Sequence, residues 1–274
     1  MCLHARQWRF LIADIQPIVT AAQEWAHCLA RWAVPEEILT QASESPWIHP
    51  PALFDVPEVI ETTPSHQRAR EVLDDSAIVL DVGCGGGIAA FALCPPASSV
   101  MGVDHQPEML EMFRANAESR GVTVQTQLGD WPQVAPLVAR ADVVTAHHVA
   151  YNVADIVPFL RALGEHARQR VVLELPQQHP LAGLSPAWRH FWQLERPTTP
   201  TPHDLMAVLR EMGIDASLEL WSGPTRVEHD EAMAAHYNRI RLCLAPEREH
   251  EVLEFLRENP APGTRELATI WWDV

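Results

Sequence analysis

Residues 79–87 read Val-Leu-Asp-Val-Gly-Cys-Gly-Gly-Gly and join a short apolar run to a segment of helical character that begins at Ile88. Glycines at such a junction let the backbone turn tightly and approach a ligand without an intervening Cβ. The dinucleotide fingerprint G-x-G-x-x-G is incomplete, because Ile88 stands where its last glycine belongs. A phosphate-binding P-loop is absent as well, since the chain contains no lysine. The segment therefore predicts a strand–turn–helix unit that suits a ligand without a pyrophosphate.

Outside this segment, the hydrophobic pattern alternates between strand-like and helix-like runs. We expect strands at residues 77–81, 99–104, 123–128, 141–146, 170–175, 216–221 and 266–272. Helices are expected at residues 66–73, 88–93, 107 onward, 156–167, 203–212, 230–242 and 247–257, with a proline-rich loop over 176–202. Strands that alternate with helices at this spacing indicate an α/β fold with a parallel sheet.

The N-terminal part of the chain has a different pattern. Apolar residues recur at helical spacing from about Arg6 to Ala33, and Pro17 is expected to kink or divide that helix. Prolines fill the connector over residues 45–64. We therefore predict a helical cap or lid with a linker over residues 1–64, and one α/β domain over 65–274 whose cofactor-binding core spans 75–175.

The segment at 79–87 resembles motif I of the class I, Rossmann-like, S-adenosylmethionine-dependent methyltransferases of bacterial type, whose consensus is roughly V-L-D-x-G-C-G-x-G. Further motifs follow in the order of that family. They are Val103-Asp104 after the second strand, Gln106 to Leu110 at a helix start, Leu128-Gly-Asp130-Trp131 after the third strand, and Ala141-Asp142-Val-Val in the fourth. The resemblance covers roughly residues 75 to 175.

This resemblance implies both a fold and a cofactor. The implied fold is an α/β, Rossmann-like sheet of seven mostly parallel strands in the order 3-2-1-4-5-7-6, with helices on both faces and the last strand antiparallel. The implied cofactor is S-adenosyl-L-methionine. In the family, the glycine turn packs on its methionine portion, which the acid at Asp81 helps to orient, and the acid at Asp104 accepts hydrogen bonds from the ribose. Asp130 and Trp131 are expected to hold the adenine. The cofactor-binding residues expected in this chain are Asp81, Gly83, Cys84, Gly85, Gly87, Asp104, His105, Met109, Gly129, Asp130, Trp131 and His147.

Three residues after the fourth strand are candidates for the methyl-transfer step: His147, His148 and Tyr151. A hydroxyl or amine acceptor can require a base whose pKa is near neutrality, and histidine is the usual choice. Side chains alternate along an extended backbone, so at most one of the two histidines is expected to face the pocket. The alternative role for either histidine is a structural hydrogen bond beneath the cofactor.

Composition limits the partners. The formal net charge is −16 and the arginines form no run, so a nucleic-acid acceptor is disfavoured. The five cysteines are scattered without a C-x-x-C pair, no signal-peptide pattern opens the chain, and no apolar run is long enough for a membrane span. These features favour a cytoplasmic protein with neither a disulfide framework nor a metal site.

The expected function is therefore methyl transfer to a small molecule, with the acceptor and its reacting atom unidentified and a homodimer left open. Tryptophan-rich pieces at residues 47–50 and 188–192 are candidates for a lid over an apolar pocket, with ordinary core packing as the alternative. Two competing functions also stay open. One is an NAD-linked oxidoreductase, which shares the strand, the glycine turn and the ribose acid. The other is a non-catalytic cofactor-binding or regulatory protein of the same fold.

Overall fold

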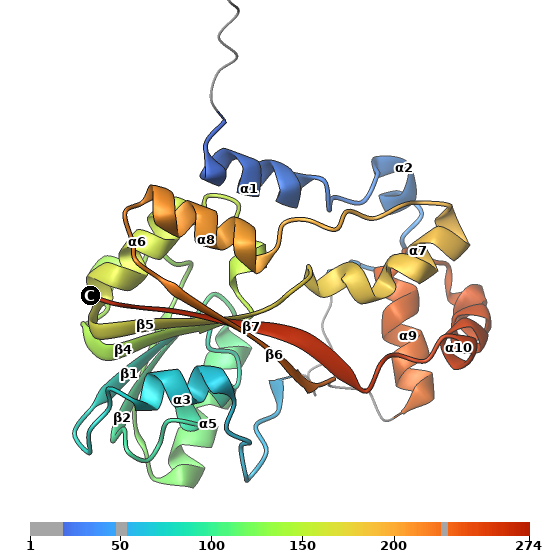
Figure 1. Ribbon diagram of the computed structural model, residues 1–274. Coiled ribbons are helices and arrows are strands. Elements are labelled where there is room, and N and C mark those ends of the chain that lie inside the picture. Colours follow the sequence, from blue (N-terminus) through green and yellow to red (C-terminus); the bar gives the residue numbers. More distant parts are fainter. Residues whose placement is uncertain (1–18, 48–53, 226–229) are drawn as a thin grey trace, which may run out of the picture.

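A seven-stranded sheet forms the centre of the computed structural model, which describes residues 19–47, 54–225 and 230–274 (Figure 1). The strands are β1 (Ile78–Val82), β2 (Ser99–Asp104), β3 (Thr123–Leu128), β4 (Ala141–His147), β5 (Ala167–Pro176), β6 (Ser217–Pro224) and β7 (Thr264–Asp273). Their order is β3-β2-β1-β4-β5-β7-β6, with β1 to β5 parallel and β7 antiparallel to both β5 and β6. The predicted fold class and strand order are confirmed.

Helices follow most of the predicted segments. They are α1 (Ala21–Ala30), α2 (Glu36–Leu39), α3 (Pro64–Arg70), α4 (Ile88–Phe91), α5 (Pro107–Arg120), α6 (Ile156–His166), α7 (Ser185–Trp192), α8 (Pro202–Glu211), α9 (Glu231–Arg241) and α10 (Glu249–Glu258). The helix α7 differs from the prediction, which left residues 176–202 as a loop. Its one proline inside the helix is in the first turn, where a missing N–H costs nothing. The expected kink at Pro17, and His49 and Pro50 of the expected lid, lie outside the described residues.

Both faces of the sheet are covered, as predicted. On one face α1, α6 and α8 pack around Trp25, Phe159 and Leu205, while on the other α3, α4 and α5 pack around Phe91 and Phe113. Trp25 is fully buried and its Nε1 donates to the Val153 carbonyl at 2.9 Å. The described part of the N-terminal segment is therefore integrated into the core by α1.

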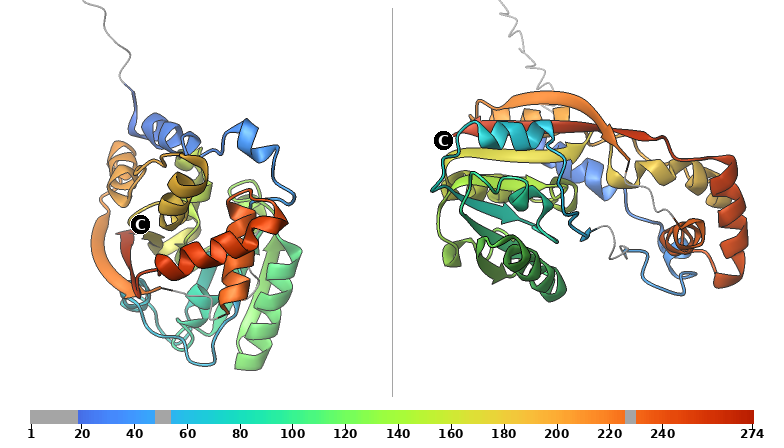
Figure 2. Two further views of the ribbon diagram at one scale, coloured as in Figure 1. Left: turned by 90° about the vertical axis from the view of Figure 1, so that its right-hand side faces the viewer. Right: turned by 90° about the horizontal axis from the view of Figure 1, so that it is seen from below.

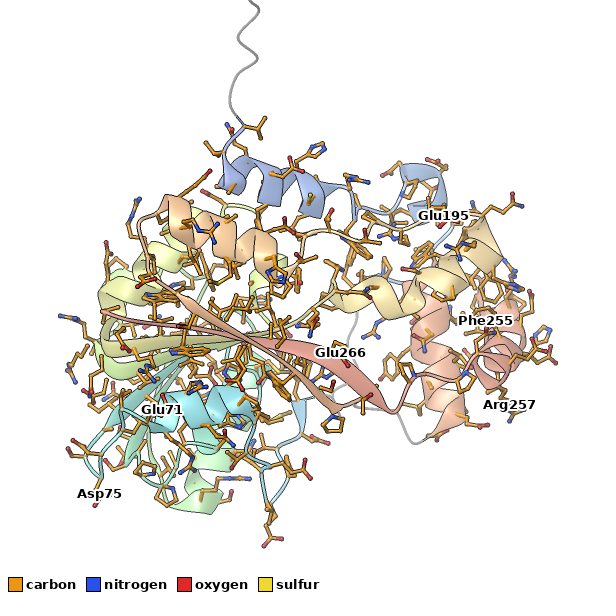
Figure 3. The ribbon with its side chains drawn as sticks, in the orientation of Figure 1. Glu71, Asp75, Glu195, Phe255, Arg257 and Glu266 are labelled. Atoms are coloured by element: carbon orange, nitrogen blue, oxygen red, sulfur yellow. The ribbon has the colours of Figure 1, made fainter. Side chains whose placement is uncertain are left out.

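A second body of helices lies beyond the carboxyl ends of the parallel strands (Figures 1 and 2). We call α2, α7, α9 and α10 the helical cap; this set differs from the cap predicted over residues 1–64, which contains only α2 of the four helices. Its own apolar cluster is built from three distant parts of the chain around Ile38, Trp188, Leu242 and Val252. In Figure 3, Phe255 and Arg257 mark α10 of the cap, and Glu266 marks the start of β7, which leads back into the sheet.

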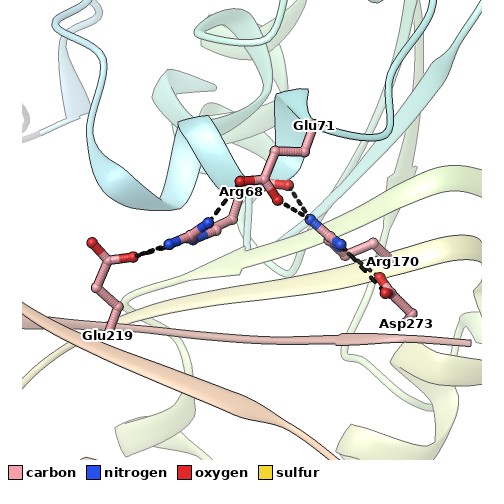
Figure 4. Close-up of polar contacts among 5 residues, drawn as sticks. All are labelled: Arg68, Glu71, Arg170, Glu219 and Asp273. Carbon is pink, nitrogen blue, oxygen red and sulfur yellow. Dashed lines mark hydrogen bonds and ion pairs between the residues drawn. The ribbon is translucent and has the colours of Figure 1, made fainter.

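An ion-pair network fixes α3 against the sheet (Figure 4). Arg170 of β5 donates from Nε to Asp273 Oδ1 at 2.7 Å and from Nη1 to Glu71 Oε2 at 2.6 Å. Arg68 of α3 bonds to Glu71 and reaches Glu219 of β6 at 2.9 Å. Because these contacts join the C-terminal end of α3 to β5, β6 and β7, they hold this helix against the sheet.

Candidate active site

The glycine turn leaves β1 at the switch point of the sheet, since β1 pairs with β2 on one side and with β4 on the other. Gly83 has φ +70 and Gly87, which caps α4, has φ +100. A Cβ on Gly83 would lie 2.5 Å from Val149, and one on Gly87 would lie 2.2 Å from the Phe91 ring. Positive φ values and close neighbours both require glycine at these two positions.

Asp104 ends β2 beside this turn and is held by backbone donors. The Gly85 N–H donates to its Oδ2 and the Gln106 N–H to its Oδ1, both at 3.0 Å. A carboxylate oxygen accepts more than one hydrogen bond, so each keeps a free lone pair. Asp104 is 8% exposed and lines the cavity. His105 lies beside it, with Nδ1 3.6 Å from Asp104 Oδ1. This geometry suits a carboxylate that accepts from two neighbouring hydroxyls.

Asp81 lies under the glycine turn and is 1% exposed. Thr145 Oγ1 donates to its Oδ1 at 3.0 Å, whereas Oδ2 is buried without a hydrogen-bond partner. Burial raises the pKa of Asp81 to about 7, with a further rise from the charge of Asp104. An orphaned carboxylate oxygen at a cavity wall has the chemistry to receive an ammonium or another cation.

The third predicted element follows β3. Gly129 has φ +140 and its N–H donates to the Asp104 carbonyl at 3.0 Å, which joins this turn to the end of β2. Asp130 is exposed, and the Trp131 ring packs edge-on against His166 with centroids 4.9 Å apart. Trp131 Nε1 is buried without a hydrogen-bond partner. The flat Trp131 ring and the Asp130 carboxylate therefore lie together just after the end of β3.

All of the predicted site residues except Tyr151 line one large cavity. It lies between the carboxyl edge of the sheet and the helical cap and has a volume of about 2590 Å³. Single-ligand sites usually have roughly 300–1,000 Å³, so there is room for a cofactor together with a second molecule. The cap contributes Ala187, Tyr237 and Phe255 to its wall, and Trp47 lies at the same cavity with 57% of its surface exposed.

A cluster of polar side chains occupies the carboxyl ends of β4 and β5. His148 has φ +62, and its Nε2 lies 3.1 Å from Glu174 Oε1. Thr63 at the start of α3 donates to Glu174 Oε2 at 3.1 Å. The His66 and His147 rings stack with centroids 5.6 Å apart. The turn at His148 breaks the strand alternation, so both His147 and His148 lie at the cavity, where the sequence predicts at most one of them.

The two histidines have different surroundings. His147 is half-buried, its Nε2 atom is buried without a hydrogen-bond partner, and desolvation of the ring lowers its pKa to about 3. His148 keeps 34% of its side chain exposed. For Glu174, burial alone would raise the pKa, but the hydrogen bonds from His148 and Ser65 outweigh it and lower the pKa below its usual range. The Glu174 carboxylate is therefore ionised at neutral pH.

Tyr151, the third catalytic candidate, has a structural environment. Its hydroxyl donates to the Pro176 carbonyl at 2.8 Å, and its ring stacks on Trp25 with centroids 5.7 Å apart. Burial raises the pKa of the hydroxyl above its usual value. Tyr151 also meets the His179 ring, which in turn stacks on Trp32 at 4.1 Å. These contacts connect the cavity loop at His179 to the N-terminal segment.

Sequence reasoning missed Glu174, His66 and Thr63. Glu174 is an acid inside the apolar run of β5, and its place near the carboxyl end of a predicted strand was the available signal. His66 and Thr63 come before the predicted core, and nothing in the local pattern places them at β5. Within the described ranges, no group of three His, Cys, Asp or Glu side chains is arranged to hold a metal ion. No helix in those ranges is long and apolar enough to cross a bilayer.

Comparison with known proteins agrees with this geometry. Residues 79–170 match the methyltransferase domain family. Over 87 residues the chain is 37% identical to the ubiquinone biosynthesis O-methyltransferase of Azorhizobium caulinodans, covering 32% of this chain and 34% of that protein. Over 107 residues it is 36% identical to the ribosomal protein L11 methyltransferase of Photobacterium profundum, covering 37% and 36%. The chain thus spans about a third of the length of these curated relatives.

Solved structures share the fold. The YcgJ protein of Bacillus subtilis superposes with a TM-score of 0.52 at 19% identity, over 76% of this chain and 97% of that one. A putative methyltransferase of Bacillus halodurans gives 0.51 at 17% identity, over 77% and 97%. The sheet order and the glycine turn at its switch point define a Rossmann-like α/β protein of class I methyltransferase topology. With the domain match, residues 79–170 form a methyltransferase domain within this fold.

Proposed function

We propose that the protein transfers the methyl group of S-adenosylmethionine to a small-molecule acceptor in the cavity between the sheet and the helical cap. The observation that carries this proposal is the glycine-rich turn at Gly83 to Gly87, which lines that cavity beside the Asp104 carboxylate. S-adenosylmethionine supplies a methyl group already activated on a sulfonium, so the protein has to bind, align and exclude water.

The residues present fit this cofactor. The glycine turn would receive its methionine portion, Asp104 its ribose hydroxyls, and Asp130 with Trp131 its adenine. The orphaned Oδ2 of Asp81 supports a cationic group above the turn. Three carboxylates on neighbouring strand ends suit a cation and oppose a pyrophosphate, which disfavours the NAD-linked alternative.

The cap supports an enclosed acceptor site. Its side of the cavity carries apolar and aromatic side chains such as Ala187, Tyr237 and Phe255. Such a wall favours a small, partly apolar molecule over a folded macromolecule. We accordingly assign the helical cap and the described part of residues 19–64 to acceptor enclosure, and the sheet with its flanking helices to the cofactor. A cytoplasmic location and a homodimer remain predictions.

The test uses the protein with methyl-labelled S-adenosylmethionine and a small-molecule extract or a protein extract of bacterial cells. After ultrafiltration and chromatographic removal of unreacted S-adenosylmethionine, the proposal expects label in a new low-molecular-weight product of the filtrate. Label transferred to retained protein would contradict a small-molecule acceptor. Tight S-adenosylhomocysteine binding with no transfer to either fraction would favour the non-catalytic alternative.

A further inference from the structure

We propose that Glu174 and His148 act as a pair on the acceptor. In this pair, Nδ1 of His148 removes the proton of an acceptor hydroxyl while Glu174 holds the ring from its other nitrogen. The proposal rests on the function proposed above and names the acceptor class: molecules whose reacting hydroxyl is neutral in solution and must lose a proton. Glu174 is a positioning residue in this scheme, because it acts through His148.

The contacts of Glu174 fix both the place and the tautomer of the His148 ring. Nε2 of His148 lies 3.1 Å from Oε1, the His148 backbone N–H donates to the Glu174 carbonyl at 2.6 Å, and Thr63 bonds to the second carboxylate oxygen. An ionised carboxylate only accepts, so a hydrogen bond at this contact requires the proton on Nε2 and leaves the lone pair of the neutral ring on Nδ1. Nδ1 has no hydrogen-bond partner among the described residues.

The position of the pair suits contact with a ligand. Glu174 has 6% of its side chain exposed, whereas His148 has 34% and lines the cavity. The carboxylate is thus shielded while the imidazole reaches the solvent-filled space. A buried carboxylate that orients a histidine whose other nitrogen faces the substrate is the arrangement that makes histidine an effective general base.

The two other histidines of the cluster are neutral. Burial lowers the pKa of both His66 and His147, so both rings are neutral at neutral pH. Nδ1 of His66 also accepts from the Thr63 backbone N–H at 3.1 Å, which excludes a proton on that nitrogen. The negative charge of Glu174 therefore has no cation among these neighbours. A proton on His148 would supply one at 3.1 Å from the carboxylate.

The step balances in atoms and charge. The acceptor O–H bond breaks and its proton moves to Nδ1 of His148, while the oxygen forms a bond to the methyl carbon. The carbon–sulfur bond breaks with its electron pair going to sulfur, which yields neutral S-adenosylhomocysteine and the methyl ether. The imidazolium lies against Glu174 until water takes the proton. No oxidant or metal is required.

A series of phenols tests the proposal directly. The probes are phenol, catechol and 4-nitrocatechol, used with S-adenosylmethionine and followed by S-adenosylhomocysteine release. The first two keep their hydroxyl protons at neutral pH, as the tyrosine side chain does, while the nitro compound is largely ionised. For catechol, His148→Gln is expected to lower kcat by about 100-fold or more. For 4-nitrocatechol the loss should fall below about threefold, because no base is required.

Two further variants complete the design. Glu174→Gln keeps the shape and the acceptor oxygen but removes the charge, and it should lower kcat for catechol roughly tenfold with little change in KM. The control His250→Gln, at an exposed position on α10, should leave every rate unchanged. S-adenosylhomocysteine affinity, measured on each variant, reports whether the fold and cofactor site are intact.

Several outcomes overturn the proposal. Equal losses in His148→Gln for catechol and 4-nitrocatechol would give the ring a structural role. Nitrogen NMR that finds the His148 proton on Nδ1 would contradict the tautomer. Wild-type protein that binds S-adenosylhomocysteine but methylates none of the phenols contradicts the hydroxyl class. A wild-type protein without affinity for S-adenosylhomocysteine would instead contradict the proposed function.

Discussion

The substitution Asp81→Asn removes a buried charge and is expected to change how stability depends on pH. Burial raises the pKa of Asp81 from 3.8 to about 7, and Oδ2 has no partner. In the unfolded chain the group ionises near its ordinary value, so the folded state becomes less stable as pH rises from about 4 to about 7. About three pH units at 1.36 kcal/mol each give a loss of about 4 kcal/mol at pH above 7.

The assay is urea unfolding of the ligand-free protein and of Asp81→Asn at about pH 4.5 and about pH 8. The free energy of unfolding of the variant minus that of the wild type should rise by about 3–4 kcal/mol between these values, because the asparagine does not ionise. Other titrating groups are common to both proteins and cancel in the difference. A difference that stays constant with pH would refute the reasoning.

The same carboxylate should make cofactor binding depend on pH. If the ionised form of Asp81 attracts a cationic cofactor, protonation through about pH 7 weakens binding. Affinity for S-adenosylmethionine is then expected to fall about tenfold between pH 8 and pH 6 in the wild type. In Asp81→Asn it should be weaker at pH 8 and nearly flat. Titration of the ligand itself is shared by both proteins, so parallel pH profiles would contradict a contact with Asp81.

Three other substitutions test the fold and the site. Gly87→Ala should destabilise the protein by about 2–4 kcal/mol in urea unfolding and abolish S-adenosylhomocysteine binding. The control Gly121→Ala, also at positive φ but in open space, should cost about 1 kcal/mol. Equal costs would contradict the steric argument. Trp25→Ala should cost about 3–5 kcal/mol, while Trp47→Ala should leave the free energy of unfolding within about 0.5 kcal/mol; a small cost at Trp25 would refute its place in the core. Arg170→Ala should lower the free energy of unfolding by about 2–3 kcal/mol, because it removes the hydrogen bonds to two carboxylates. Cofactor affinity, measured by calorimetry, should stay unchanged. A loss of affinity without a loss of stability would contradict a structural role.

The strands of the sheet could be predicted because short stretches of sequence are enough to identify them. Short runs of apolar residues mark the five parallel strands, and the glycines at 83–87 are required by a turn that any Cβ would obstruct. Asp104 was also within reach, since it directly follows a strand and precedes a helix. The resemblance supplied the strand order, including the antiparallel β7, which residue periodicity alone does not determine.

The helical cap and the polar cluster could not be predicted in the same way. The cap brings together α2, α7, α9 and α10 from three distant parts of the chain, and the local pattern of each helix does not show which of the others it packs against. Glu174 lies within an apolar strand sequence, and its place in the polar cluster depends on a hydrogen bond from Thr63, which is 111 residues away in the chain. The left-handed turn at His148 is likewise a backbone feature that strand alternation does not foresee.

A calorimetric titration with S-adenosylhomocysteine tests the central claim most directly. The account predicts one site of micromolar affinity in the wild type. In Asp104→Asn, whose side chain no longer offers two charged acceptors to the ribose, affinity should fall about tenfold or more. Absence of binding at millimolar ligand, or equal affinity in both proteins, would contradict a nucleoside held between the glycine turn and this carboxylate.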